Sequence, residues 1–315
     1  MKILVTGGCG YKGSVLVPKL LKKGYEVIVF DTMWFGNFLK PHQSLEVIKG
    51  SVIDDETVPL ANVDGIIHLS SVANDPCGDL NPKLTWETSC LATMKLADNA
   101  VRAGVSRFIY ASSGSVYGLK DEENVTEELN LVPLSEYNKT KMVAERALIS
   151  YSEQINTQIV RPATVCGFSP RMRLDVSVNM LTMQALINQK ITVLGGMQTR
   201  PNIHIDDITD LYIFLLERPD LTGTFNAGFE NLSIMEIAKL ISKKTEAEIV
   251  VKESNDPRSY RIDSSKLLKT GFTPKKTVLD AIDELTVLYK NGTLRNDKHF
   301  YNLDWMKEQV LEKAN

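Results

Sequence analysis

Short, mostly apolar segments alternate with longer helical segments in the first half of this chain, and this alternation restricts the fold more than any other feature. Segments typical of buried strands are Lys2–Thr6, Glu26–Asp31, Leu45–Lys49, Gly65–Leu69, Arg107–Ala111 and Thr157–Arg161. Helices are expected between them, including Tyr11–Lys23, Leu84–Ala103 and Tyr137–Tyr151. Apolar strands separated by helices indicate a parallel sheet covered on both faces. The repetition predicts an α/β fold with a doubly wound, Rossmann-like sheet.

The pattern changes after Pro162 and predicts a smaller C-terminal lobe. Later helices are expected at Val178–Asn188, Ile205–Arg218, Ser233–Thr245 and Thr277–Asn291, and later strands at Ile191–Leu194, Thr224–Ala227 and Glu248–Lys252. The elements between about 203 and 228 are placed to rejoin the large sheet. We therefore expect a dinucleotide-binding domain at 1–165 plus about 203–228, and a substrate-binding lobe at about 166–202 and 229–315.

Charge and hydropathy argue against nucleic acid and membranes as partners. The 315 residues carry a net charge of −3, and neither half is strongly basic. A polyanion partner needs a basic surface, which this balance does not provide. The first apolar run ends at Thr6, which is too short for a membrane span or a signal-peptide core. We expect a cytoplasmic protein.

Cysteine and histidine placement argues against a metal site. The four cysteines, Cys9, Cys77, Cys90 and Cys166, are scattered without the spacing of metal ligands, and reduced thiols are expected. His68 falls in an apolar strand and is expected to be a core residue. Beside His204, the carboxylates of Asp206 and Asp207 are expected to cap the helix that follows.

Three glycines follow the first strand and open the first helix. Gly7, Gly10 and Gly13 have the spacing that permits a tight turn, a close approach to a pyrophosphate and packing of the helix on the sheet. The helix N-terminus then offers N–H groups and a positive dipole end to the phosphates. Tyr11 and Lys12 lie within this turn, and Lys12 is a candidate phosphate contact. This context predicts a dinucleotide site.

An acidic residue ends the second strand. Asp31 can accept hydrogen bonds from the adenosine ribose and repel a 2′-phosphate, so NAD is expected rather than NADP. Asp54 could meet the adenine amino group, although ordinary turn chemistry explains it almost as well. The remaining candidate cofactor contacts follow the third and fourth strands: Val52, Ile53, Leu69, Ser70 and Ser71.

The chemistry is expected at Tyr137 and Lys141, which lie four residues apart and therefore on one helix face. A tyrosine pKa of about 10 makes a poor base, and lowering it to about 7 needs roughly 4 kcal/mol. A nearby ammonium and an oxidised nicotinamide both favour the phenolate. The serine-rich segment after the fifth strand, residues 112–118, reaches the sheet edge where such folds bind ligands.

Together these segments resemble the extended short-chain dehydrogenase/reductases, specifically the NAD-dependent nucleotide-sugar epimerase/dehydratase group that includes UDP-glucose 4-epimerases. The resemblance runs nearly end to end and rests on Thr6–Gly13, Asp31, Gly50–Asp54, His68-Leu69, Ser112–Gly118, Tyr137–Lys141, Arg161-Pro162, Arg200–Asp207 and Gly271–Pro274. It implies an NAD cofactor and a nucleotide-diphosphate sugar as the substrate.

The resemblance also implies roles for individual residues. Tyr137 would be the base, Lys141 its electrostatic partner and ribose ligand, and Ser113 the third catalytic member. The implied substrate contacts are Ser113, Arg171, Arg173, Asn179, Arg200 and Arg258. Members of the group usually dimerise through a four-helix bundle, to which this chain would contribute Leu84–Ala103 and Tyr137–Tyr151.

Two departures from the group narrow the reaction. Dehydratases of the group carry an Asp-Glu pair after the catalytic hydroxyl, whereas this chain has Gly114 and Ser115 there. A 4,6-dehydratase is therefore disfavoured, because no acid is placed to protonate the leaving hydroxyl. Ser89 stands where many relatives have asparagine. The segment Ser169–Asp175 resembles one in enzymes that modify GDP-heptoses for surface glycans.

Three functions remain open. The leading one is a C4 epimerase that passes through a 4-keto sugar. The second is a net oxidoreductase, either a 4-ketoreductase or a C4 dehydrogenase, which uses the same residues but consumes cofactor. The third is a non-catalytic NAD-binding regulator, a role that would not require both Tyr137 and Lys141.

Overall fold

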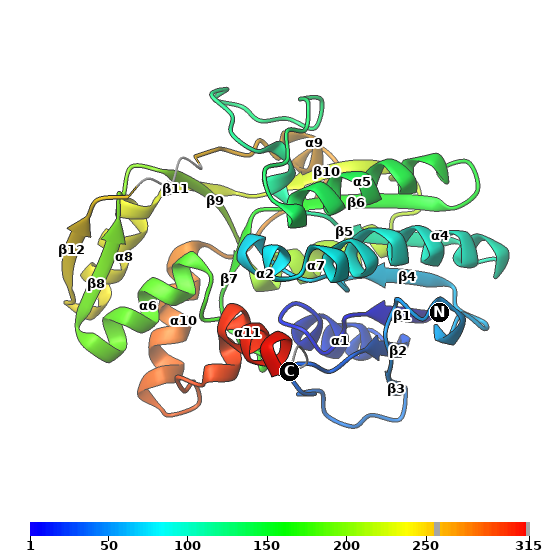
Figure 1. The fold of residues 1–315 in the computed structure, drawn as a ribbon, viewed down its shortest axis with the longest axis horizontal. Coiled ribbons are helices and arrows are strands. Elements are labelled where there is room, and N and C mark those ends of the chain that lie inside the picture. Colours follow the sequence, from blue (N-terminus) through cyan, green and yellow to red (C-terminus); the bar gives the residue numbers. More distant parts are fainter. Residues whose placement is uncertain (255–258, 313–315) are drawn as a thin grey trace.

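A seven-stranded parallel sheet forms the centre of the larger lobe in the computed structural model, which describes residues 1–254 and 259–312 (Figure 1). Its strands are β1 (Lys2–Thr6), β2 (Glu26–Asp31), β3 (Leu45–Lys49), β4 (Gly65–His68), β5 (Arg107–Ala111), β6 (Asn156–Pro162) and β10 (Gly223–Ala227). Their order is β10-β6-β5-β4-β1-β2-β3. From β1 the chain adds β2 and β3 on one side, and then adds β4, β5, β6 and β10 on the other side. The switch point between β1 and β4 opens a crevice at the carboxyl ends of the strands.

Helices cover both faces of this sheet because alternate strand residues point to opposite sides. Ile3 and Val5 of β1 pack in one core with α1 (Gly13–Lys22) and α7 (Ile205–Leu216). Leu4 packs in the other core with α4 (Ala92–Arg102) and α5 (Glu136–Ser150). The doubly wound arrangement expected from the apolar strands is therefore confirmed.

The helix expected at Leu84–Ala103 is interrupted rather than regular. It consists of α3 (Pro82–Trp86), a π-helical turn, η2 (Glu87–Leu91), and α4. Within the π-helical turn, the Ser89 hydroxyl accepts a hydrogen bond from the Val72 N–H at 3.2 Å. A π-turn of this kind places one side chain out of helical register. Ser89 thereby fixes the loop after β4 to the helix.

The smaller lobe lies at the left of Figure 1 and contains two short sheets. One has the order β11-β9-β7, from Glu230–Ser233, Thr199–His204 and Thr164–Cys166. The other pairs β12 (Glu248–Lys252) with β8 (Lys190–Leu194). The accompanying helices are α6 (Ser177–Asn188), α8 (Ile234–Thr245), α9 (Ser265–Leu268) and α10 (Val278–Lys290). The expectations missed β7, β9 and β11, which are only three to six residues long.

A C-terminal segment returns from the smaller lobe to the larger one. It includes η4 (Lys298–Phe300) and α11 (Asn302–Glu312), and α11 packs against α2 (Asp75–Leu80). Met306 is buried with Val72 and Cys77, and the Trp305 ring lies 6.3 Å from the Phe35 ring. This return was not expected from the sequence, and it covers loops that border the crevice. The remaining short helical turns are η1 (Asp55–Thr57) and η3 (Gly114–Tyr117).

Candidate functional site

The three glycines of the first turn have different structural roles. Gly7 adopts a φ of +72°, and a Cβ there would lie 2.7 Å from the Ser70 nitrogen. A Cβ on Gly13 would lie 2.4 Å from the Gly8 oxygen, so this glycine lets α1 pack closely on the turn. A Cβ on Gly10 would meet only the Gly7 oxygen, at 3.2 Å, and Gly10 lines the cleft. Space for a pyrophosphate therefore lies at Gly10, beside the N-terminus of α1.

The side chains that follow Gly10 line the same cleft. The Tyr11 hydroxyl donates to the Gly167 carbonyl at 2.7 Å, which connects the turn to the smaller lobe. The Lys12 ammonium lies 3.4 Å from the Tyr212 hydroxyl. Burial, with a smaller contribution from Arg173, lowers the pKa of Lys12 to about 8. An anionic ligand beside Lys12 would favour its charged form.

Asp31 borders the end of the cleft where the adenosine is expected. Its carboxylate accepts hydrogen bonds from the Cys9 N–H at 2.9 Å and the Met33 N–H at 2.7 Å, which hold the loops after β1 and β2. Burial raises the pKa of Asp31 above its ordinary value despite these bonds. The ring of Phe35, which the sequence analysis missed, also lines this end.

Of the other predicted cofactor contacts, four line the cleft and two do not. Val52, Leu69, Ser70 and Ser71 are lining residues. Ile53 and Asp54 are not among the described residues that line the cleft, and Asp54 is exposed. Asp54 precedes the short turn η1, so turn chemistry accounts for it better than contact with an adenine.

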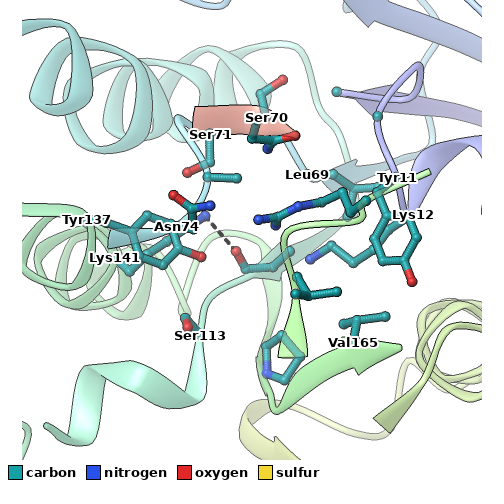
Figure 2. Close-up of a pocket in the computed structure, with 18 of the residues that line it drawn as sticks. Tyr11, Lys12, Leu69, Ser70, Ser71, Asn74, Ser113, Tyr137, Lys141 and Val165 are labelled. Atoms are coloured by element: carbon teal, nitrogen blue, oxygen red, sulfur yellow. Dashed lines mark hydrogen bonds between the residues drawn. The ribbon is translucent and has the colours of Figure 1, made fainter. Parts of the chain in front are cut away.

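Tyr137, Lys141 and Ser113 meet at the far end of the cleft (Figure 2). The first two lie one turn apart on α5, and Ser113 follows β5. The Lys141 ammonium donates to the Ala111 carbonyl at 2.7 Å and lies 5.9 Å from the centre of the Tyr137 ring. The chain folds so that a phenol, a hydroxyl and an amine line one space.

Burial dominates the electrostatics of this group. It raises the pKa of Tyr137 to about 12, although a hydrogen bond with Ser113 acts in the opposite direction. Burial, reinforced by Lys12, holds the pKa of Lys141 well below its usual range, against the opposing influence of Glu145. The expected acidic phenol is therefore not a property of the protein alone. Positive charge supplied by a bound ligand has to offset the burial.

The loop after Ser113 has no carboxylate at positions 114 and 115, where the resemblance to dehydratases would place two acids. The Ser113 hydroxyl lies 2.6 Å from the Ser115 hydroxyl, which in turn donates to the Asn138 side chain. A Cβ on Gly114 would lie 2.4 Å from the Ile262 Cδ1 atom. A glycine held by close packing and a serine engaged with asparagine supply no proton donor of carboxyl acidity.

A buried ion pair lies beneath this loop, and the sequence analysis missed it. Glu145 lies one turn after Lys141 on α5, and its carboxylate contacts the Arg161 guanidinium at 2.7 Å. The Ser112 hydroxyl donates to Glu145, and Arg161 donates to the Tyr117 hydroxyl at 2.7 Å. Glu145 therefore ties both ends of the Ser112–Tyr117 loop to the helix that carries Tyr137.

A second ion pair lines the cleft from the smaller lobe. Arg173 binds Asp175 through Nε at 2.9 Å and Nη2 at 3.0 Å. The Asn74 amide, on the loop after β4, also donates to Asp175 at 3.1 Å. Asn74 has a φ of +79° and caps α2. A sequence signal existed, because Asn74-Asp75-Pro76 is typical of a helix start.

Of the other predicted substrate contacts, some line the cleft and some do not. Arg200 lines the cleft from β9, and Arg258 lies outside the described residues. Arg171 lines it too, but its guanidinium lies 3.9 Å from the centre of the Phe35 ring and donates to Asn302 at 2.6 Å. Asn179 is buried behind the wall, where its amide holds the Tyr11 hydroxyl at 3.1 Å, and is not among the described lining residues.

The histidines and cysteines form no metal site in the described ranges, where no cluster of three or more potential ligands occurs. His68 is buried and contacts Thr6 and Thr93, as expected for a core residue. The expected caps of α7 are wrong. The His204 ring accepts from the Asp206 N–H, whereas Asp207 accepts from the backbone of Lys275.

All four cysteines are buried. Among the helices of the described residues, none combines the length and the apolarity needed to cross a bilayer.

Comparisons with known proteins agree with this geometry. A model of the NAD dependent epimerase/dehydratase family matches residues 3–228. UDP-glucuronic acid decarboxylase 6 of Arabidopsis thaliana is 33% identical over 296 residues, covering 87% of this chain and 84% of that protein.

Solved structures confirm the fold class. The UDP-glucose 4-epimerase of Thermotoga maritima, with UDP-glucose, has a TM-score of 0.84 and 26% identity, covering 94% of this chain and 100% of that one. The UDP-glucuronic acid 4-epimerase of Bacillus cereus, in complex with UDP-glucuronic acid and NAD, has a TM-score of 0.80 and 26% identity, covering 92% and 99% respectively.

Proposed function

Because this chain belongs to the NAD-dependent epimerase/dehydratase family, we propose that it is a nucleotide-sugar C4 epimerase acting through a transient 4-keto sugar. The observation that carries the proposal is the meeting of Tyr137, Lys141 and Ser113 at one end of the cleft, with Gly114 and Ser115 in place of acids. The family includes epimerases, dehydratases and decarboxylases of nucleotide sugars.

The residues of the larger lobe fit the NAD cofactor. The open face of Gly10 would receive the pyrophosphate, Asp31 the adenosine ribose and Lys141 the nicotinamide ribose. When bound, NAD accepts a hydride from the sugar carbon and returns it. Residues 1–165 plus about 203–228 would hold this cofactor, while about 166–202 and 229–315 would hold the nucleotide sugar.

Tyr137 is the group that exchanges a proton with the sugar. As C4 is oxidised, the phenolate takes the proton of the C4 hydroxyl, and it gives the proton back when the ketone is reduced. The Ser113 hydroxyl, which shares a hydrogen bond with Tyr137, would bond the same oxygen and support the phenolate. Reduction on the opposite face of the keto sugar inverts C4. No net oxidant is consumed, so the cofactor can remain bound.

The substrate diphosphate would lie against Arg200, because a guanidinium fork matches phosphate oxygens. The neighbouring pair of Arg173 and Asp175 borders the space that the sugar would fill.

A net C4 oxidoreductase is the second candidate. The bridge from Asn74 through Asp175 to Arg173 joins the loop after β4 to the smaller lobe at the cleft, and a wall fixed in this way would oppose rotation of a keto sugar. Such an enzyme would use the same Tyr137 chemistry but change the cofactor stoichiometrically.

A homodimer is the proposed assembly. The helical face formed by η2, α4 and α5 exposes Leu91, Met94 and Ile149. Apolar side chains gathered on neighbouring helices are typical of a helix-bundle interface. The molar mass in solution, measured by light scattering, tests the dimer.

Product analysis tests the reaction. The purified protein is incubated with UDP-, GDP- and dTDP-hexoses, and products are identified by NMR while NADH absorbance is followed. A C4 epimer formed without added cofactor supports the epimerase, and stoichiometric NADH supports the oxidoreductase. A Tyr137→Phe variant is the control. If that variant keeps full activity, or if no hexose on the panel reacts, the proposed chemistry is wrong.

A further inference from the structure

Arg171 is a fully buried arginine in the wall of the cleft, with only 1% of its surface exposed. In the described part of the chain its guanidinium makes no ion pair. Nη1 donates to the Met172 carbonyl at 3.0 Å and Nη2 to the Asn302 side chain at 2.6 Å, and both acceptors are uncharged. The buried Nε–H has no hydrogen-bond partner among the described residues. A buried cation with a free donor is costly unless a ligand completes its contacts.

Three interactions place Arg171 at the cofactor end of the cleft. Its guanidinium lies 3.9 Å from the centre of the Phe35 ring, on the loop after β2. Two residues earlier in the chain, the Ser169 hydroxyl donates to the Tyr11 carbonyl at 2.8 Å, which holds this segment against the glycine turn. The charge of Asp31, at the end of β2, also acts on Arg171. The arginine therefore lies between the turn expected to hold the pyrophosphate and the loop beside the adenosine.

The free protein compensates the charge of Arg171 poorly. Burial and the neighbouring Arg173 lower the pKa of Arg171 to about 9, although Asp175 and Asp31 act in the opposite direction. A diphosphate against this guanidinium would favour its charged form and offer oxygen acceptors to the free Nε–H. A bound anion would thus remove a cost that the free protein carries.

Asn302 connects this arginine to the C-terminal segment. It is a buried residue that lines the cleft at the beginning of α11. One turn further along α11, Met306 is buried with Val72 and Cys77, and α11 packs against α2. The packing of α11 therefore sets the position of the Asn302 oxygen that holds the Arg171 guanidinium.

We propose that Arg171 binds the pyrophosphate of NAD from the smaller lobe, and that Asn302 positions it so that the cofactor is retained between turnovers. The nucleotide sugar also carries a diphosphate, but Phe35, Asp31 and the link from Ser169 to Tyr11 assign Arg171 to the cofactor. This inference rests on the proposed function and deepens it, since an epimerase regenerates its cofactor and needs no exchange. It moves Arg171 from the predicted substrate contacts to the cofactor site.

Calorimetric titration of the full-length, cofactor-free protein with NAD, and separately with UDP, distinguishes the two diphosphates. Arg171→Met removes the charge and the donors but keeps an unbranched chain beside the Phe35 ring. We expect the Kd for NAD to rise at least tenfold and the Kd for UDP to stay within twofold. If the Kd for UDP rises instead, or if neither changes, the inference is wrong.

The matched control is Arg218→Met. Arg218 also lies over a phenylalanine ring, 5.5 Å from the centre of Phe214, but it pairs with Asp220 at the surface. Both dissociation constants should stay unchanged in this variant. If Arg171→Met does not fold, Arg171→Lys takes its place, because lysine keeps the charge and loses the Nε–H. A wild-type Kd for NAD in Arg171→Lys would then overturn the inference.

Thermal unfolding separates a binding role from a structural one. Replacing a buried, unpaired cation by an apolar side chain should leave the melting temperature of the free protein unchanged or higher. Saturating NAD should stabilise the wild type more than Arg171→Met at the same concentration. A much lower melting temperature of the free variant with an unchanged Kd for NAD would make Arg171 a structural residue.

The rate of cofactor release tests the role of Asn302. Bound NADH is displaced by excess NAD, and its fluorescence is followed. Asn302→Leu removes the acceptor of the Arg171 Nη2 group and should release NADH at least fivefold faster. Asn302→Asp keeps an acceptor and should release it at close to the wild-type rate. Equal rates in the wild type and both variants would refute retention through Asn302.

The outcomes also separate this inference from the proposed reaction. If NAD binding depends on Arg171 but no C4 epimer forms, the inference stands and the proposed reaction is wrong. If the wild type forms the epimer and Arg171→Met keeps its affinity for NAD, the reaction stands and the inference fails. If the wild type does not bind NAD, both fail.

Discussion

Replacing Glu145 with glutamine should destabilise the protein far more than the same change at Glu136. Both residues lie on α5 and both form ion pairs of 2.7 Å, with Arg161 and Lys139 respectively. The Glu145–Arg161 side chains are 1% and 6% exposed, whereas the Glu136–Lys139 side chains are 26% and 43% exposed. The two variants therefore compare a buried pair with a solvated one on the same helix.

The expected losses in the free energy of unfolding differ several-fold between the two variants. Removing one member of a buried ion pair leaves the other charge without compensation and costs about 3–5 kcal/mol. An exposed pair contributes about 0.2–1 kcal/mol. Urea unfolding should show a lower midpoint with an unchanged slope for Glu145→Gln. Its melting temperature should fall by roughly 10 °C, against 1–3 °C or so for Glu136→Gln.

A double variant checks the cause. Replacing Glu145 by glutamine and Arg161 by methionine removes both charges, so part of the lost stability should return. Turnover should also fall in Glu145→Gln, because Glu145 holds the Ser112–Tyr117 loop that carries Ser113. Equal destabilisation by the Glu145 and Glu136 variants would refute the reasoning about burial.

Three further outcomes are expected. Gly10→Ala should weaken NAD binding, measured by calorimetric titration, with little loss of stability. Gly13→Ala should lower the thermal unfolding temperature, because its Cβ would lie 2.4 Å from the backbone oxygen of Gly8. The tyrosinate absorbance difference between wild type and Tyr137→Phe should show a pKa of about 12 without cofactor and a lower pKa with oxidised NAD, and an unchanged pKa would contradict the proposed charge compensation. Asp31→Asn should narrow the preference for NAD over NADP, measured by binding of each, since the repelling carboxylate is lost.

The local part of the site could be predicted from the sequence. The spacing of Gly7, Gly10 and Gly13, and the single helical turn between Tyr137 and Lys141, are short-range patterns that fix geometry directly. The apolar strands gave the parallel sheet for the same reason, because burial on both faces requires apolar residues at consecutive positions.

The long-range part could not be predicted in this way. Glu145 and Arg161 meet only because α5 and β6 pack together, and Asp175 meets Asn74 across 101 positions of the chain. The Asn179 side chain carries an amide that could bind a ligand, yet in the folded protein this amide donates to the Tyr11 hydroxyl. The electrostatics of Tyr137 also depend on burial, which raises its pKa in the protein without cofactor and which no local sequence pattern reports.

The returning segment formed by η4 and α11 has a consequence for biosynthesis. Residues 298–306 are translated long after the loops that they cover, so Val72 and Cys77 of the nascent larger lobe lack their Met306 partner until then. The apolar side chains beneath α2 therefore stay exposed to water until residues 298–306 have been synthesised. The wall beside the expected adenosine end forms only then. The cleft is therefore incomplete on this side until residues 298–306 have been synthesised.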